Sequence, residues 1–127
     1  MHNINVSKFI NLTLAFLWIY QGLVPKLLFI NADEIYIWQL FGLSYEYAKF
    51  AGQISGIIEI VFGICFIFLT NKYLHFLSIL GLIFLFILVS FLLPTSLISA
   101  FNPVVMNFAM ISLSVLYLLI HQQNIHK

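Results

Sequence analysis

One carboxylate in this sequence occupies a position where a charge is costly. Glu59 lies ten residues into the apolar run 49–69. If this run crosses a bilayer, Glu59 lies near the midplane, where an ionised side chain costs at least about 2.5–3.5 kcal/mol. Such a carboxyl group must face the interior of a helix bundle and either pair with a cation or carry a proton. We therefore take Glu59 as the first candidate for ligand contact; the alternative is a hydrogen-bonded glutamate that only fixes packing.

Three glycines share a face with this glutamate. Gly52, Gly56, Glu59 and Gly63 are spaced four, three and four residues apart. At about 100° per residue they fall within a stripe roughly 60° wide. Small residues on one stripe let two helices approach closely, so we predict that these glycines pack helices together, with Gly22 in the first apolar run in the same role.

Depth along the helices selects the possible neighbours of Glu59. Counting ~1.5 Å per residue from the outer ends, Gln21 lies about 14 Å deep, close to the ~15 Å of Glu59, whereas Lys26 and Asn107 lie about 6 Å deep. Lys26 could reach toward Glu59 if Pro25 bends its helix, but a lysine near a span end more commonly snorkels outward. The alternative to a binding site is ordinary hydrogen bonding between helices, worth about 0.6 kcal/mol per pair. The predicted ligand-binding residues carry polar or aromatic side chains and face the interior: Trp18, Gln21, Lys26, Gln53, Glu59 and Asn107.

The secondary-structure elements that position these residues must be stable in lipid. Hydrophobic residues make up 63% of the 127 positions and charged residues 7%, against roughly 25% charged residues in ordinary soluble domains. The mean hydropathy is +1.09. A chain this short with so few polar groups must have lipid as its main solvent. A net charge of +1 from scattered lysines argues against a nucleic-acid partner.

Four apolar runs are long enough to cross a bilayer as helices, at about 8–30, 49–69, 73–93 and 103–121. They are continuous rather than alternating, which excludes a β-barrel. The first run exceeds the apolar core of a signal peptide, so we expect it to be retained. The sequence therefore predicts an all-α membrane protein, with a four-transmembrane-helix bundle formed by the single domain 1–127.

The connection between the first two runs is long and aromatic. Residues 31–48 include Tyr36, Trp38 and Tyr45, and Asp33 and Glu34 are placed to start a short helix. Aromatic residues favour the headgroup level of a membrane. We expect this segment to be interfacial, lying along the membrane surface.

The lysines give the orientation. Lys8, Lys72 and Lys127 fall on one side of the four runs, and Lys26 and Lys49 on the other. The positive-inside rule places the three-lysine side, with both termini, in the cytoplasm. We expect a multi-pass protein of the bacterial inner membrane whose polar interior lies in the outer half, with a plain cytoplasmic half.

The sequence gives little support for disulfide, metal or haem chemistry. The single Cys65 allows neither an internal disulfide nor a two-cysteine redox relay. His75 and His121 lie at similar depth and could ligate a haem, but interfacial histidines are the simpler interpretation. We predict no metal site and no catalytic residues, and the cofactor stays open, with a quinone as a candidate and haem disfavoured.

Polar residues also line two of the helices. Asn11, Trp18 and Gly22 share a face of the first run, and Asn107, Ser114, Tyr117 and His121 share a stripe of the fourth together with Met110.

Three stretches, taken in order, resemble the DoxX-like membrane proteins. They are Trp18–Leu27 in the first run, Gly56–Gly63 in the second and Phe101–Asn107 opening the fourth. The resemblance implies four spans and a redox setting, because the family takes its name from a small membrane subunit associated with thiosulfate:quinone oxidoreduction. It supplies no catalytic residues. The positions that match its recurrent pattern are Trp18, Gln21, Gly22, Pro25, Lys26, Glu59, Asn102, Pro103 and Asn107.

Three functional hypotheses follow. The leading one is an accessory subunit of a redox system, rather than a catalyst, that holds a quinone-like or other lipophilic ligand in an outer-half pocket. Its partner would be a separate oxidoreductase or further copies of the chain. The alternatives are a structural scaffold without a ligand and a small oligomeric transporter.

Overall fold

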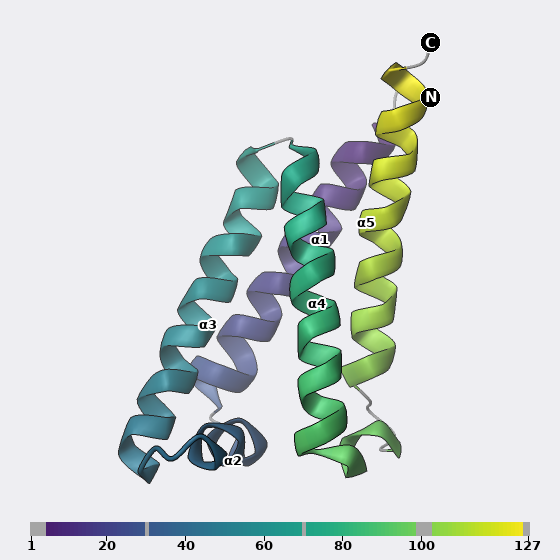
Figure 1. The fold of residues 1–127 in the computed structure, drawn as a ribbon. Coiled ribbons are helices and arrows are strands. Elements are labelled where there is room, and N and C mark those ends of the chain that lie inside the picture. Colours follow the sequence, from purple (N-terminus) through teal and green to yellow (C-terminus); the bar gives the residue numbers. More distant parts are fainter. Residues whose placement is uncertain (1–4, 30, 70, 99–102, 126–127) are drawn as a thin grey trace. The chain divides into compact units, whose positions relative to one another are not determined.

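The computed structural model describes residues 5–29, 31–69, 71–98 and 103–125, and throughout these ranges it contains helices and no strand. The elements follow one another as α1 (Val6–Leu23), the π-helix η1 (Val24–Leu28), α2 (Ala32–Leu40), α3 (Tyr45–Phe68), α4 (Lys72–Leu92), the 3-10 helix η2 (Pro94–Ile98) and α5 (Pro103–Ile125) (Figure 1). The prediction of an all-helical chain is therefore confirmed for the described residues.

The helix ends differ from the predicted runs where capping groups decide them. α3 begins at Tyr45, four residues before the predicted Lys49, because Ser44 caps it and its hydroxyl accepts a hydrogen bond from the Tyr47 amide at 3.4 Å. α5 continues past the predicted His121 to Ile125. Of the predicted positions, Ile30, Phe101, Asn102 and Lys127 lie outside the described residues.

The first run changes its helix type at a proline. Pro25 has no amide hydrogen, so the α-helical bond from residue 25 to residue 21 cannot form. The backbone widens into η1, in which the Phe29 amide donates to the Val24 carbonyl at 2.8 Å. A π-turn of this kind inserts an extra residue and rotates the side chains that follow, and Lys26 lies within it.

The aromatic connection contains the short helix that its acidic residues predict. The Asn31 side chain caps α2 by accepting from the Asp33 amide at 2.7 Å, and Asp33 and Glu34 occupy the first turn. After α2, Gly42 adopts a φ of +94°, a conformation that glycine reaches without steric penalty. The chain then turns into α3.

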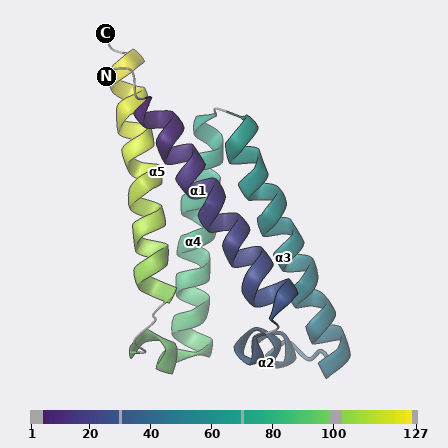
Figure 2. The same cartoon turned by 180° about the vertical axis from the view of Figure 1, so that it is seen from behind.

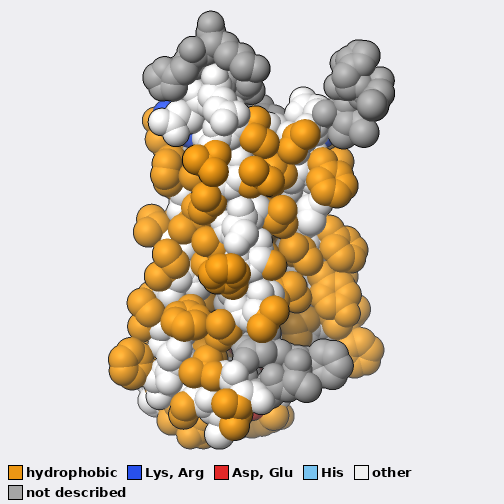
Figure 3. Space-filling view, turned by 90° about the vertical axis from the view of Figure 1, so that its right-hand side faces the viewer, with side chains coloured by type: hydrophobic (Ala, Val, Ile, Leu, Met, Phe, Trp, Pro, Cys, Tyr) orange, Lys and Arg blue, Asp and Glu red, His pale blue; other side chains and the backbone are white. Residues whose placement is uncertain are grey.

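Three helices are long and apolar enough to cross a membrane: α3, α4 and residues Val104–Gln123 of α5. Residues Val6–Leu28 are long and apolar enough only when they are counted together with α2. The two helices are bent by 86° relative to each other. The described residues thus provide three candidate spans, or four if this bent pair counts as one. Large hydrophobic side chains are exposed along these helices, among them Ile58, Leu80 and Phe108, and in Figure 3 hydrophobic side chains cover most of the face in view.

The chain divides into two compact units, residues 13–69 and residues 1–12 with 70–127. In the first unit, α2 and η1 pack against α3, and the second half of α1 runs beside α3 (Figure 2). In the second unit, α4 packs along α5 and η2 contacts both.

A close backbone contact in unit 13–69 joins two glycines. A Cβ atom placed on Gly56 would lie 2.6 Å from the Gly22 carbonyl oxygen, and one placed on Gly22 would overlap the Gly56 carbonyl oxygen. A Cβ on Gly63 would lie 2.9 Å from the Ala15 carbonyl oxygen. Helices α1 and α3 therefore approach through positions that accept no side chain.

Replacing Gly22 with alanine tests this contact. Gly22→Ala should lower the free energy of unfolding by about 1–3 kcal/mol, because the new methyl group meets rigid backbone. Gly81→Ala is the matched control, since a Cβ there meets nothing within 4 Å. Unfolding by SDS titration in mixed micelles measures both; equal effects of the two substitutions would contradict the close contact.

Candidate functional site

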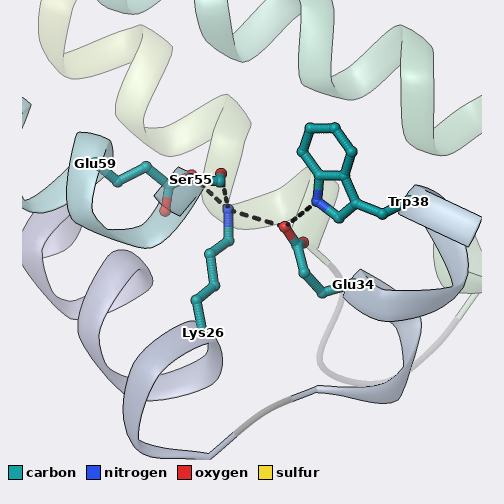
Figure 4. A network of polar contacts seen from close by, with 5 residues as sticks. All are labelled: Lys26, Glu34, Trp38, Ser55 and Glu59. Carbon is teal, nitrogen blue, oxygen red and sulfur yellow. Dashed lines mark hydrogen bonds and ion pairs between the residues drawn. The ribbon is translucent and has the colours of Figure 1, made fainter. Parts of the chain in front are cut away.

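Lys26 lies at the centre of a polar cluster in unit 13–69. Its Nζ donates hydrogen bonds to Glu59 Oε1 at 2.8 Å and to Ser55 Oγ at 3.1 Å. It also forms an ion pair with Glu34 Oε1 at 3.6 Å. The indole Nε1–H of Trp38 donates to the same Glu34 oxygen at 3.2 Å. We call these five residues the Lys26 cluster (Figure 4).

Three elements position the cluster. Lys26 projects from η1, so the π-turn after Pro25 sets its direction. Ser55 and Glu59 lie four residues apart on α3, and Glu34 and Trp38 lie four residues apart on α2. A spacing of four places two helical side chains on the same face, so each helix presents a pair to Lys26. In Figure 4 the Lys26 side chain ends between the α3 pair and the α2 pair.

The cluster is largely removed from solvent and is unevenly charged. The side chains of Lys26 and Glu59 are 14% and 11% exposed. One ammonium group faces two carboxylates, which gives the cluster a formal charge of −1 when both carboxylates are ionised. Glu59 Oε2 is buried and has no hydrogen-bond partner in the described part of the chain. Buried carboxylate oxygens are usually hydrogen-bonded, so this atom can still accept a hydrogen bond.

Lys26 turns inward toward Glu59, which is the less common of the two alternatives that the sequence left open. Snorkelling is favoured when the interior offers a lysine no acceptor. Here three oxygens surround the ammonium group, and η1 directs the side chain toward them. Among the six predicted ligand-binding residues, Lys26 and Glu59 are in direct contact with each other.

The other four predicted residues lie outside the cluster. Trp18 is buried and packs edge-on against Phe62, with ring centroids 5.1 Å apart. Gln21 lies on α1 and Gln53 on α3, both half-buried. Asn107 is buried on α5, which belongs to the other compact unit.

Three members of the cluster are not among the residues predicted from the sequence to bind a ligand: Glu34, Trp38 and Ser55. The sequence indicated Glu34 only as the start of a helix, and Trp38 only as an interfacial aromatic residue. The signal was present in the spacing of four between Glu34 and Trp38 and between Ser55 and Glu59. A spacing of four shows that two residues share a helix face, but not toward which neighbour that face turns.

A second polar cluster lies in the unit that contains α4 and α5. His75 is buried, and its Nε2 lies 2.7 Å from Asn11 Oδ1 and its Nδ1 lies 3.1 Å from Ser114 Oγ. The Tyr117 ring stacks on the imidazole, with centroids 3.8 Å apart and planes 13° apart. We call Asn11, His75, Ser114 and Tyr117 the His75 cluster.

The partners of His75 fix its tautomer. Asn11 Oδ1 can only accept, so Nε2–H donates to it, and in the neutral ring Nδ1 then accepts from the Ser114 hydroxyl. Both ring nitrogens are thus engaged, and ligation of a haem iron by His75 would break one of these bonds. The described residues contain no group of three or more His, Cys, Asp or Glu side chains suited to a metal ion.

This cluster corrects the expectation of a plain cytoplasmic half. His75 belongs to the first turn of α4, on the side that we predicted to be cytoplasmic. Separately, Asn11, Ser114 and Tyr117 are ordinary polar positions on helix stripes. In the folded chain these residues contact His75, and Asn11 and His75 are 64 positions apart. A pattern within one helix cannot show such a contact.

A sequence model of the DoxX-like family matches residues 15–115. The matched range contains all of the Lys26 cluster. No curated protein and no solved structure matches the chain.

Removing the central ammonium group should leave two carboxylates without their cation. Lys26→Met should lower the free energy of unfolding by roughly 2–4 kcal/mol, because breaking a buried pair leaves an uncompensated charge. The double variant Lys26→Met/Glu59→Gln should recover part of this loss. Lys49→Met is the control, since Lys49 forms no ion pair within the described residues. Strictly additive effects of the two substitutions, measured by SDS titration, would argue against the contact.

Two serines on α5 form a matched pair for the His75 cluster. Ser114 is fully buried and bonded to His75, whereas the exposed Ser112 bonds to the Phe108 carbonyl in its own helix. Ser114→Ala should destabilise the protein by about 1–3 kcal/mol, because a buried imidazole nitrogen loses its donor. Ser112→Ala should change stability by less than about 0.5 kcal/mol. A thermal unfolding series in detergent compares the two, and a smaller effect at Ser114 would contradict the described network.

Proposed function

The chain belongs to the DoxX-like family, and from this premise we propose that it is a membrane accessory subunit of a redox system that binds a lipophilic, quinone-like molecule at the Lys26 cluster. The family and the apolar helices identify an integral membrane protein. The redox setting is carried over from the family resemblance. In this proposal the catalytic half is a separate oxidoreductase.

The observation that carries the proposal is the free acceptor on Glu59. An ion pair that served only to join helices would be expected to satisfy both carboxylate oxygens, because an unpaired buried oxygen lowers stability. Oε1 is held by Lys26, while Oε2 has no partner among the described residues. An ionisable side chain kept in this state within a candidate span favours a ligand contact.

The proposed placement in the membrane has four spans. Val6–Leu28 combines the 18 residues of α1 with the 5 of η1, which as a helix reaches about 34 Å and suffices for a ~30 Å hydrocarbon core. α3, α4 and α5 supply the other spans, and α2 lies along the membrane surface. The lysine count favours cytoplasmic termini in a bacterial inner membrane.

A structural role is the second candidate, and one observation favours it. A Cβ on Gly56 would lie 2.9 Å from Lys26 Cβ, so the ion pair joins α3 to the chain segment that the glycines already hold against it. In this hypothesis the ion pair and the glycine contact together fix the register of the two elements. Glu59→Gln would then be nearly neutral for every cellular function.

Ligand retention separates the two candidates. The wild-type protein, purified in mild detergent, should retain an organic molecule, and Glu59→Ala should retain at least about tenfold less, since a charged hydrogen bond is lost. Glu46→Ala is the matched control, because Glu46 is an exposed carboxylate on the same helix. Solvent extraction and mass spectrometry measure retention, and circular dichroism verifies the fold. If no specific molecule is found in any of the three proteins, the structural role is favoured.

A further inference from the structure

The hydrogen-bond donors of the Lys26 cluster are almost fully used. A lysine ammonium group has three N–H donors and no acceptor. The Lys26 ammonium faces three oxygens, Glu59 Oε1, Ser55 Oγ and Glu34 Oε1. The single N–H of the Trp38 indole is directed to Glu34. Two of the three Lys26 N–H donors therefore form hydrogen bonds, and the Glu34 carboxylate lies at ion-pair distance from the same ammonium group. The indole donor of Trp38 is also used.

The hydrogen-bonding capacity that remains in the Lys26 cluster is mainly that of an acceptor. Glu59 Oε2 has no partner within the described residues. Ser55 Oγ accepts from Lys26, and a serine hydroxyl carries one hydrogen of its own. A head group that both donates and accepts would satisfy both atoms, by donating to Oε2 and accepting from Ser55.

The net negative charge of the cluster also favours a ligand that donates a hydrogen bond. With one ammonium and two carboxylates, the excess charge is negative and one carboxylate oxygen is unshared. A carbonyl oxygen placed beside Oε2 would bring two sets of lone pairs together and leave Oε2 unpaired. A hydroxyl hydrogen placed there would form a charge-assisted bond, which is among the stronger hydrogen bonds.

We propose that the Lys26 cluster selects lipophilic molecules whose head group carries a hydroxyl donor, and so binds the quinol form of a quinone-like ligand in preference to the quinone. This inference rests on the proposed function and names the ligand form that its site accepts. The ligand hydroxyl donates to Glu59 Oε2 and accepts from the Ser55 hydroxyl.

Glu59 Oε2 is itself buried, but the two carboxyl-bearing side chains are not fully enclosed. The Glu34 side chain is 21% exposed and the Glu59 side chain 11%. Both oxygens belong to one carboxylate group, and in this proposal the ligand reaches Oε2 when the last bond of the side chain rotates.

Glu59→Gln should invert the preference. The Lys26 ammonium requires an acceptor, so the amide oxygen of the glutamine takes the place of Oε1. The amide NH₂ group then occupies the place of Oε2 and offers donors instead of an acceptor. The variant site should bind a quinone carbonyl and lose its preference for the quinol, with almost no change in side-chain shape.

The test compares decyl-substituted benzoquinol and benzoquinone under anaerobic conditions. Ligand bound to the detergent-purified full chain is quantified by chromatography, after subtraction of ligand in empty micelles. The wild-type protein should bind the quinol at least about tenfold more tightly, as expected for one hydrogen bond to a charged group. Glu59→Gln should bind the quinone as tightly as the quinol or more tightly. Glu46→Gln, which removes an exposed carboxylate from α3, should behave as the wild type.

A second pair of probes needs no variant. 4-Decylphenol and its methyl ether differ mainly in the hydroxyl hydrogen, so the wild-type protein should bind the phenol at least about tenfold more tightly. This comparison stands even if Glu59→Gln fails to fold, which thermal unfolding would reveal.

The outcomes separate the two proposals. If the wild-type protein binds neither the quinol nor the quinone, the proposed function is overturned together with this inference. If it binds the quinone as tightly as the quinol, or the ether as tightly as the phenol, the inference is overturned and the proposed function stands. A quinol preference that persists in folded Glu59→Gln also overturns the inference, because the donor would then be recognised elsewhere.

Discussion

The interaction on which unit 13–69 depends is the contact of the Lys26 ammonium with two carboxylates in surroundings of low polarity. Two charges on different helices are tolerated there only when they lie close enough to form an ion pair. The requirement links η1, α2 and α3, because Lys26, Glu34 and Glu59 each come from a different one of these elements. An error in the rotation of any one element would leave a charge unpaired, so this contact constrains all three.

Backbone features make this contact possible. Glycines at positions 22 and 56 let the end of α1 approach α3 until carbonyl oxygens lie where side chains would otherwise be. Pro25 then removes one α-helical hydrogen bond, and the π-turn that follows rotates Lys26. Close approach brings the lysine within reach of Glu59, and the rotation decides that it points inward. The contact between the charged side chains therefore depends on three uncharged residues: Gly22, Gly56 and Pro25.

The two polar clusters differ in a way that bears on their roles. In the His75 cluster a neutral ring has each nitrogen matched to one partner and one face covered by Tyr117. A satisfied neutral network of this kind fixes helix positions. The Lys26 cluster holds three charged groups and an unpaired acceptor. A ligand can use an unpaired acceptor, and this difference supports our proposal that the second cluster binds a ligand while the first stabilises the fold.

The sequence by itself determined the helical class, the approximate candidate spans and the short helix that begins near Asp33 and Glu34. Long apolar runs in lipid satisfy their backbone groups only as helices, and capping is a local interaction of neighbouring residues. It also identified Glu59 and the glycine stripe, because charge and spacing are visible along one helix. Only the tertiary structure decided that Lys26 turns inward, that Glu34 and Trp38 join it, and that His75 meets Asn11 and Ser114. These contacts join residues far apart in the sequence, and they depend on how each helix is rotated and how far along it each residue lies. A sequence pattern leaves both quantities open by about a helical turn, and the flexible stem of a lysine can reach in either direction.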